Sequence, residues 1–393
     1  MYPTLSYLIF DITGKYYPLP FFTFGIMMAI SFAAAYIIFV REFKRKEQEG
    51  IVPFERVNKT FGTVPSMTDN IVNALVGGII GFKIIGLILD YSTHSENPQE
   101  YILSMQGSFI GLLVGVAIAV YTSYADTLKI KKQYPEPITK EVNQYPHELM
   151  GNILMVAALS GLFGAKLFDA MERWDEFVAH PIEQLASFSG LTFYGGLICG
   201  AIGVIWYTRK HKIPLLPLLD IGAPAMMLAY GVGRIGCQLA GDGDWGIVNT
   251  APKPGWMSFL PDWMWAFDYP RNVAHEGTRI LYDAPGTFNT ALEAPVFPTP
   301  FYEAILGILL FIFLWNIRKR LVKPGLLWCV YLIVNGIERF CVERIRVNPP
   351  YHFAGLAFSQ ATMIASMLFI VGIGMGAYLL LRKEKPQQDE TLA

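Results

Sequence analysis

The residues best suited to chemistry in this chain are arginines set in apolar sequence. Arg234 lies near the end of one apolar segment, within Gly231-Val-Gly-Arg-Ile-Gly236, and Arg339 lies near the end of another. An arginine at the centre of a membrane helix costs roughly 2.5 to 3.5 kcal/mol on insertion scales, so such a residue is expected to face a polar cavity. The guanidinium is always charged and binds two oxygens at once, which suits a phosphate. These arginines therefore indicate an enzyme that handles a phospholipid headgroup inside the membrane.

Two acidic residues follow the first arginine. Glycines, Gly236 among them, are expected to thin the helix around Arg234 and then to end it, which leaves Asp242 and Asp244 at its outer end, shortly before Gly246. This spacing is no dinucleotide-binding fingerprint, because a membrane helix rather than a strand carries it. We expect these residues to contact the substrate or to order the end of the site.

The second arginine is followed by further charges. Arg339 and Glu343 are four residues apart, so they share one helix face and are expected to form a salt bridge. Arg346 follows shortly afterwards, where it contacts the substrate or attracts lipid phosphates without specificity. Glu343 is expected to orient Arg339.

A third cluster begins where the chain re-enters the membrane, at Pro298-Thr-Pro-Phe-Tyr-Glu303. Proline suits the first turn of a helix, and the helix dipole favours a carboxylate there. Glu303 therefore either caps this helix or, together with Tyr302, contacts the substrate.

A fourth cluster, Thr192-Phe-Tyr-Gly-Gly-Leu-Ile-Cys-Gly200, begins another apolar span. Gly195 and Gly196 permit close approach of the backbone, either to a neighbouring helix or to a ligand. Tyr194 is interpreted either as an anchor at the membrane interface or as a hydrogen-bond donor in the site.

Composition places all four clusters in a membrane protein. Hydrophobic residues make up 53% of the chain and charged residues 16%, against about 25% in soluble domains. The net charge of −1 argues against nucleic acid as a partner. No cysteine or histidine cluster has metal-ligand spacing, so neither a metal site nor a disulfide framework is predicted. The four cysteines are expected to be buried small hydrophobes: Cys199, Cys237, Cys329 and Cys341.

Apolar runs predict an all-α polytopic protein with about nine transmembrane helices. Their approximate ranges are 21–40, 70–89, 107–125, 149–168, 192–207, 217–240, 301–317, 324–341 and 357–381. Basic clusters follow alternate spans, beginning after the first one. The positive-inside rule therefore predicts an outer N-terminus and a cytoplasmic C-terminus.

We expect one transmembrane domain over residues 1–382 and a cytoplasmic tail over 383–393. Residues 241–300 are rich in Trp, Pro, Gly and Asp, and this head region is expected to fold as a small external piece, although part of it also fits an aromatic belt at the interface. Residues 62–149 hold an inserted helical hairpin.

An internal repeat supports that hairpin. Gly78-Ile-Ile-Gly-Phe-Lys83 resembles Gly161-Leu-Phe-Gly-Ala-Lys166, and the segment 107–113 resembles 191–197, at an offset of 83 to 84 residues. Either the hairpin is duplicated or two glycine-rich membrane helices are alike by chance. Lys83 and Lys166 are expected to extend their amines toward the interface.

The order and content of these clusters resemble one family, the bacterial prolipoprotein diacylglyceryl transferases. The resemblance covers about residues 21–41 and 150–382, and the hairpin at 62–149 lies outside the usual seven-helix pattern. Six segments carry it: Gly233-Arg-Ile-Gly236 through Trp245-Gly246 (family G-R-x-G-N-F-x-N-x-E-x-x-G), Asp220-Ile-Gly-Ala-Pro224 (D-x-x-A-P), Tyr194-Gly-Gly-Leu-Ile198 (H-G-G-L-I), Pro298 to Glu303 (H-P-[ST]-Q-x-Y-E), Arg339 to Arg346 (R-x-x-x-E-x-x-R) and Phe24-Gly25 (Y-G).

The chain departs from the family pattern at four places. Tyr194 and Phe297 stand where the family motifs have histidine, Cys237 stands for asparagine, and Phe24 stands for tyrosine. The stretch from Gly241 to Gly246 is also one residue longer. A histidine base at Tyr194 is thus excluded, and the identity of the proton acceptor stays open.

The resemblance implies transfer of a diacylglyceryl group from phosphatidylglycerol to the lipobox cysteine of prolipoproteins in the bacterial inner membrane. Arg234 and Arg339 would hold the phosphate, Tyr194 would bind the headgroup, and a carboxylate or water would accept the thiol proton. No cofactor is expected, and the partners are both substrates and membrane lipids. A secondary transporter of an anionic substrate and an inactive lipid-binding homologue are the alternatives.

Overall fold

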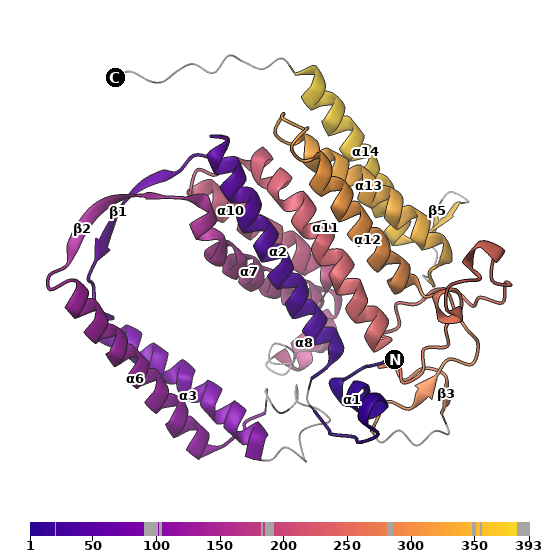
Figure 1. The fold of residues 1–393 in the computed structure, drawn as a ribbon, viewed down its shortest axis with the longest axis horizontal. Coiled ribbons are helices and arrows are strands. Elements are labelled where there is room, and N and C mark those ends of the chain that lie inside the picture. Colours follow the sequence, from indigo (N-terminus) through magenta and orange to yellow (C-terminus); the bar gives the residue numbers. More distant parts are fainter. Residues whose placement is uncertain are drawn as a thin grey trace. The chain divides into compact units, whose positions relative to one another are not determined.

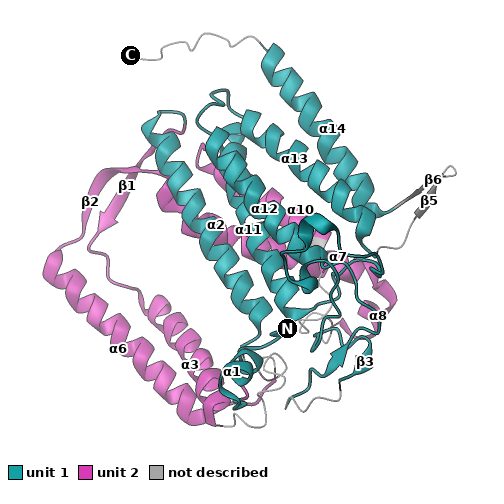
Figure 2. Cartoon of the chain, turned by 45° about the vertical axis from the view of Figure 1, so that its right-hand side comes forward, with its two compact units in different colours: residues 1–17, 21–51, 214–393 teal, residues 18–20, 52–213 magenta. Residues whose placement is uncertain are grey.

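The computed structural model is mostly helical and divides into two compact units (Figures 1 and 2). The first unit comprises residues 1–17, 21–51 and 214–393, and the second comprises 18–20 and 52–213. Placement is described for residues 1–19, 21–89, 101, 104–181, 184, 192–280, 286–347, 351–353 and 356–382. The predicted tail at 383–393 lies outside these residues.

The first unit is built around one central helix. α11 (Leu215–Ala240) packs against α2 (Thr23–Gln48), α12 (Thr299–Ile317) and α13 (Leu326–Val342), while α14 (Gln360–Leu381) packs on α13. Half or more of the apolar stretch of α11 is buried, because three helices cover it. Its core with α12 and α13 contains Ala223, Met227, Leu314 and Leu327.

The second unit consists of two helical hairpins. α3 (Met67–Leu89) packs on α6 (Phe109–Gln133), and α7 (Met150–Glu172) packs on α10 (Phe193–Lys210). The antiparallel strands β1 (Glu55–Phe61) and β2 (Ile138–Gln144) flank the first hairpin, and the short helices η1 (Pro146–Leu149) and α8 (Trp174–Ala179) flank α7.

Both hairpins make the same contacts at the offset of the sequence repeat. In each, a lysine amine donates to backbone carbonyls of the connection between the helices, and a glycine of one helix meets the backbone of the other. In the first hairpin, Lys83 donates to Tyr101 O (2.8 Å), Ser108 N donates to Phe82 O (2.9 Å), and Gly81 packs on Gly111. In the second, Lys166 donates to Gln184 O (2.9 Å), Thr192 N donates to Ala165 O (3.2 Å), and Gly164 packs on Gly195. These contacts agree with a duplicated hairpin.

The predicted all-α polytopic architecture is confirmed, since each predicted span coincides with a helix. Seven helices of the described chain are long and apolar enough to cross a membrane: α2, α3, α6, α7 with η1, α11, α12 and α14. Of the other two, α13 has only 17 residues and α10 carries Arg209 and Lys210 in its last turn. The count of nine and the orientation stay predictions.

The head region has a core of its own, formed by Trp245, Tyr269 and Val296. It contains the short helices η2 (Gly255–Met257) and η3 (Asp262–Met264) and the paired strands β3 (Thr278–Arg279) and β4 (Thr290–Ala291). The N-terminal helix α1 (Leu5–Thr13) joins it, because the hydroxyl of buried Tyr7 accepts a hydrogen bond from Phe288 N at 3.0 Å. After α13 follow η4 (Glu343–Ile345) and the strands β5 (Tyr351–Phe353) and β6 (Leu356–Phe358). The predicted limits 241–300 and 62–149 stay predictions, as does the outer location of the head.

Asp220 joins α11 to the start of α13. Its two carboxylate oxygens accept hydrogen bonds from Gly325 N at 2.8 Å and Trp328 N at 3.0 Å. These amides belong to the first turn of α13, whose donors have no partner within the helix. The buried carboxylate therefore caps α13 and holds its axis against α11.

We predict that Asp220→Ala lowers the free energy of unfolding by roughly 2 to 4 kcal/mol, because one buried and one partly buried amide lose their acceptor. Asp220→Asn keeps one amide oxygen as an acceptor and should lose less. Thermal unfolding of both variants in detergent measures the difference. Equal stability of the alanine variant and the wild type would contradict this role.

Candidate active site of the first unit

Two glycines bring α11 and α12 close enough for their charged residues to meet. A Cβ added to Gly231 would lie 2.9 Å from Ile308 N, and one added to Gly307 would lie 2.8 Å from the Cα of Gly231. Larger residues would separate the helices at this crossing. Arg234 follows less than one turn after Gly231 on α11, and Glu303 precedes Gly307 by about one turn on α12, so the crossing places these side chains together.

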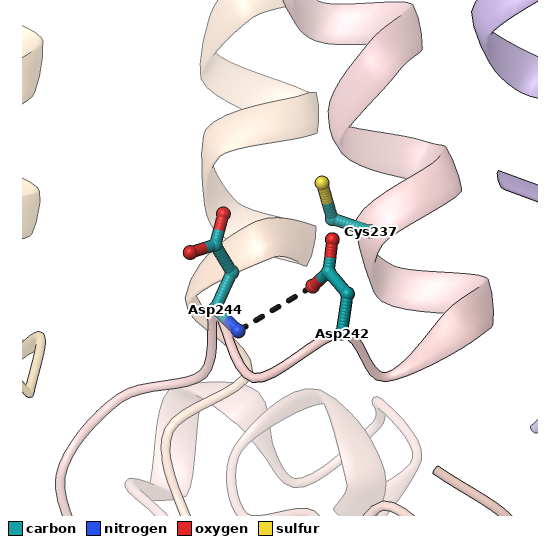
Figure 3. A group of neighbouring side chains, drawn as sticks. All are labelled: Cys237, Asp242 and Asp244. Carbon is teal, nitrogen blue, oxygen red and sulfur yellow. Dashed lines mark hydrogen bonds between the residues drawn. The ribbon is translucent and has the colours of Figure 1, made fainter. Parts of the chain in front are cut away.

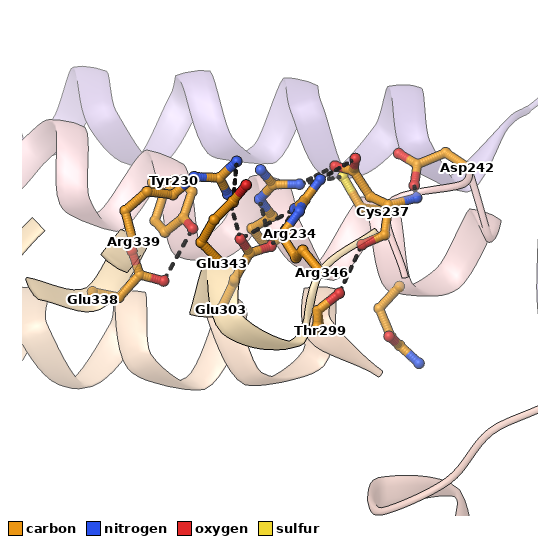
Figure 4. Close-up of polar contacts among 12 residues, drawn as sticks. Tyr230, Arg234, Cys237, Asp242, Thr299, Glu303, Glu338, Arg339, Glu343 and Arg346 are labelled. Atoms are coloured by element: carbon orange, nitrogen blue, oxygen red, sulfur yellow. Dashed lines mark hydrogen bonds and ion pairs between the residues drawn. The ribbon is translucent and has the colours of Figure 1, made fainter. Parts of the chain in front are cut away.

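Glu303 is the centre of the cluster (Figure 4). Its side chain is 0% exposed, and three arginines surround it. Arg234 Nε lies 3.1 Å from Oε2, Arg339 Nη1 lies 2.8 Å from Oε1, and Arg346 Nη1 lies 3.3 Å from Oε1. An unpaired buried carboxylate would be very unfavourable, so these guanidiniums and Glu303 depend on one another. Glu303 thus pairs with the arginines rather than only capping its helix.

Asp244 forms a second bridge between two of these arginines. One carboxylate oxygen pairs with Arg234, and the other lies 2.6 Å from Arg346 Nη2. Burial alone would raise the pKa of Asp244, but the charges of Arg234 and Arg346 outweigh this effect and lower it. The carboxylate therefore stays ionised at neutral pH. It is also 35% exposed, so it is the accessible acid of the cluster.

Gly246 places the third arginine. It forms an isolated β-bridge with Arg346, and Ile247 N donates to Ile345 O at 2.8 Å. A Cβ on Gly246 would lie 2.4 Å from Ile345 O, which is closer than real Cβ contacts. A glycine is therefore required where the head region meets the segment after α13. The Thr299 hydroxyl, at the start of α12, also donates a hydrogen bond to Asp244 O at 2.7 Å and so connects α12 to the head region.

The predicted salt bridge on α13 is confirmed. Arg339 Nη2 lies 3.6 Å from Glu343 Oε2, four residues along the helix. The hydroxyl of Ser359 donates to the other oxygen of Glu343, so the first residues before α14 also hold this carboxylate. Arg339 is thereby held between Glu303 and Glu343.

Several predicted site residues make other contacts. Gly236 faces α2, where an added Cβ would lie 3.1 Å from the Cβ of Met27. The hydroxyl of Tyr302 donates to Met264 O of the head region at 2.8 Å. Their substrate-binding roles stay predictions.

Tyr194, Gly195 and Gly196 belong to the second unit, and their position relative to the arginines is not determined. Gly195 packs against Gly164 of α7, where an added Cβ would lie 2.4 Å from a carbonyl oxygen. Close helix packing is therefore the contact that these glycines make within their hairpin. The role of Tyr194 toward the headgroup stays a prediction.

Cys237, Asp242 and Asp244 lie together at the end of α11 (Figure 3). Ligand atoms of all three are within 4.8 Å of one another, close enough for one cation to contact all of them. Both oxygens of Asp244, however, already pair with arginines, so a cation would have to compete with two guanidiniums. Asp242 accepts a long hydrogen bond from Asp244 N at 3.4 Å and so helps to shape this turn.

Tyr230 and Glu338 were not among the predicted site residues. The Tyr230 hydroxyl donates to Glu338 Oε1 at 3.2 Å, and the Arg234 guanidinium carbon lies 5.4 Å from the centre of the Tyr230 ring. Two features of the sequence could have indicated these site residues. Tyr230 and Arg234 are four residues apart on one helix face, and Glu338 directly precedes Arg339. Glu338 itself is buried.

We predict that Glu303→Gln destabilises the protein by roughly 3 to 5 kcal/mol, because it leaves buried guanidiniums without their shared carboxylate. The measurement is thermal unfolding in detergent, with Glu293→Gln in the head region as the control. Unchanged stability of Glu303→Gln would contradict the central position of this carboxylate.

Comparison with known proteins gives the family. Residues 127–378 match the family model described as prolipoprotein diacylglyceryl transferase. The chain is similar to the phosphatidylglycerol–prolipoprotein diacylglyceryl transferases of three bacteria. These are the protein of Leptospira interrogans (26% identity over 289 residues, 61% of this chain and 80% of the relative), that of Parasynechococcus marenigrum (25%, 70% and 90%) and that of Streptococcus agalactiae (28% over 272 residues, 68% and 89%). Because the match spans more than half of its length and includes all of the arginine cluster, this chain belongs to the prolipoprotein diacylglyceryl transferase family.

Proposed function

We propose that this protein transfers the diacylglyceryl group of phosphatidylglycerol to the cysteine thiol of lipoprotein precursors, in the bacterial cytoplasmic membrane. The family and the names of its relatives support the reaction, and the apolar helices support a multi-pass membrane protein. The observation that carries the proposal is the convergence of Arg234, Arg339 and Arg346 on one buried carboxylate.

The arginines serve the leaving group. Glycerol phosphate departs with the electron pair of the broken carbon–oxygen bond, and fixed positive charges in a dry site stabilise that developing charge. Arg234 and Arg339 present guanidiniums that Glu303 already orients, so little rearrangement is needed during the reaction. Tyr194 is assigned to the headgroup within the same proposal.

Asp244 is the acid that the phosphate replaces. The three arginines form ion pairs with three carboxylates, those of Glu303, Asp244 and Glu343. Glu303 and Glu343 are almost fully buried, whereas Asp244 is accessible and bridges two arginines through its two oxygens. A phosphodiester carries one negative charge and offers two free oxygens, so it can take over both contacts when Asp244 turns away.

The thiol completes the reaction. A carbon–sulfur bond forms as the bond between glycerol carbon and phosphate oxygen breaks, and the thiol proton must be accepted because the thiolate is the nucleophile. Both substrates carry their own reactive groups, so the reaction as proposed uses no cofactor.

A direct assay tests this function. Purified protein receives labelled phosphatidylglycerol and a lipobox peptide whose cysteine is either intact or replaced by serine. We expect a lipidated product with the cysteine peptide only. A transporter or an inactive lipid-binding homologue would give no such product, and its absence from a folded, lipid-binding preparation would refute the transferase.

Arg234→Lys should lose most of the activity, because an ammonium cannot bind two phosphate oxygens in the fork of a guanidinium. Loss of one such transition-state contact corresponds to a decrease of kcat/KM by roughly 100-fold or more. The same preparation should unfold near the wild-type temperature, since the positive charge beside Glu303 is kept. Full activity of the lysine variant would remove Arg234 from the phosphate site.

A further inference from the structure

Glu338 is the carboxylate of the cluster that the arginines leave unpaired. In the part of the chain that the structure describes, no lysine or arginine forms an ion pair with it, whereas Glu303, Glu343 and Asp244 each pair with arginine. Glu338 is 5% exposed, and no described residue donates a hydrogen bond to its Oε2. A buried carboxylate with an unused oxygen calls for a ligand that supplies a proton.

We propose that Glu338 is the general base that takes the proton of the substrate cysteine. This assignment rests on the transferase activity proposed above. Tyr194 replaces the family histidine and has no imidazole to accept the thiol proton, so another acceptor is needed. Glu338 can supply it, and it belongs to the same unit as the phosphate-binding arginines.

Tyr230 connects this base to the phosphate site. Its hydroxyl donates to Glu338 Oε1 at 3.2 Å and so holds the carboxylate in one orientation, with Oε2 left for the thiol. The face of its ring lies against the guanidinium of Arg234, with 5.4 Å between ring centre and guanidinium carbon. Tyr230 precedes Arg234 by about one turn of α11, or about 6 Å along the helix axis, so one side chain contacts both the base and a phosphate-binding arginine.

The proposal also requires the thiol to attack from the side on which Glu338 lies. Figure 4 shows Glu338 and Asp242 at opposite ends of the row of side chains. Asp242 follows the end of α11, which is the predicted outer end of this span, whereas Tyr230 is ten residues before that end. Substitution at a saturated carbon requires the nucleophile opposite the leaving oxygen. With the phosphate at the arginines and the acyl chains directed inward, the thiol approaches from the interior, where Glu338 lies.

The step balances without a further reactant. The thiol proton passes to Glu338 Oε2, the sulfur forms a bond with the glycerol carbon, and the carbon–oxygen bond breaks. Its electron pair goes to the phosphate oxygen, so glycerol phosphate leaves. Glu338 then releases its proton to water that enters with the departing product, and the carboxylate is restored.

The test compares two nucleophiles on the full-length protein. Turnover is measured with lipobox peptides that carry either cysteine or selenocysteine, since a selenol is more acidic than a thiol and is ionised without a base. Glu338→Gln keeps an acceptor for Tyr230 but cannot take a proton, so kcat with the cysteine peptide should fall roughly 100- to 10,000-fold. With the selenocysteine peptide, the decrease should be at least about tenfold smaller. Binding of phosphatidylglycerol should not change, because the arginines are intact.

Three variants serve as controls. Glu338→Asp keeps the carboxylate and should retain more activity than the glutamine variant. Tyr230→Phe removes only the orienting hydroxyl and should lower turnover of the cysteine peptide roughly fivefold, again with a smaller loss for selenocysteine; it carries the test if Glu338→Gln does not fold. Glu42→Gln alters another buried carboxylate, which pairs with Arg45 and Arg318, and should leave the ratio of the two turnovers unchanged.

The outcomes are separable. If the wild type is active and Glu338→Gln turns over the cysteine peptide equally fast, Glu338 is not the base, and the transferase activity still stands. The same holds if Glu338→Gln loses turnover equally with the cysteine and selenocysteine peptides. A wild type that lipidates neither peptide would overturn the transferase and, with it, this role of Glu338.

Discussion

The structure of the site depends on one buried carboxylate that holds three arginines. Glu303 is fully enclosed and pairs with guanidiniums from α11, from α13 and from the segment after α13. Neither partner would be stable alone at this depth, because an isolated charge in a nonpolar environment is strongly disfavoured. The carboxylate holds the arginines close together and oriented before any substrate arrives. That arrangement suits a phosphate, which has to bind quickly and leave with additional negative charge.

The backbone makes this arrangement possible through three glycines at two contacts. Gly231 and Gly307 let α11 and α12 approach, and Gly246 lets the head region meet the strand-like segment that carries Arg346. Each contact excludes a Cβ, so each couples helix packing directly to the position of a charge. The second unit uses glycines in the same way, but there they close two hairpins, each completed by a lysine that binds the connecting carbonyls.

The sequence predicted features that depend on neighbours along the chain. Apolar length identified the helices, and the four-residue spacing of Arg339 and Glu343 identified their salt bridge. The pairing of Glu303 with all three arginines was not predictable, because it arises from the crossing of α11, α12 and α13. Glu303 alone fitted a capping role equally well. Tyr230 and Glu338 were missed for the same reason, since 108 residues separate the partners of that hydrogen bond. Motif resemblance supplied the reaction but offered no acceptor in place of the missing histidine.

Phosphate binding by the arginines is tested most directly by a structure in nanodiscs with a phosphonate analogue of phosphatidylglycerol, in which a methylene group replaces the oxygen that leaves. We expect phosphonate oxygens at hydrogen-bonding distance, about 2.7 to 3.2 Å, from the guanidiniums of both Arg234 and Arg339, with Asp244 displaced. A phosphonate bound away from both arginines, with the contacts of Asp244 and Glu303 unchanged, would show that these arginines do not form the phosphate site.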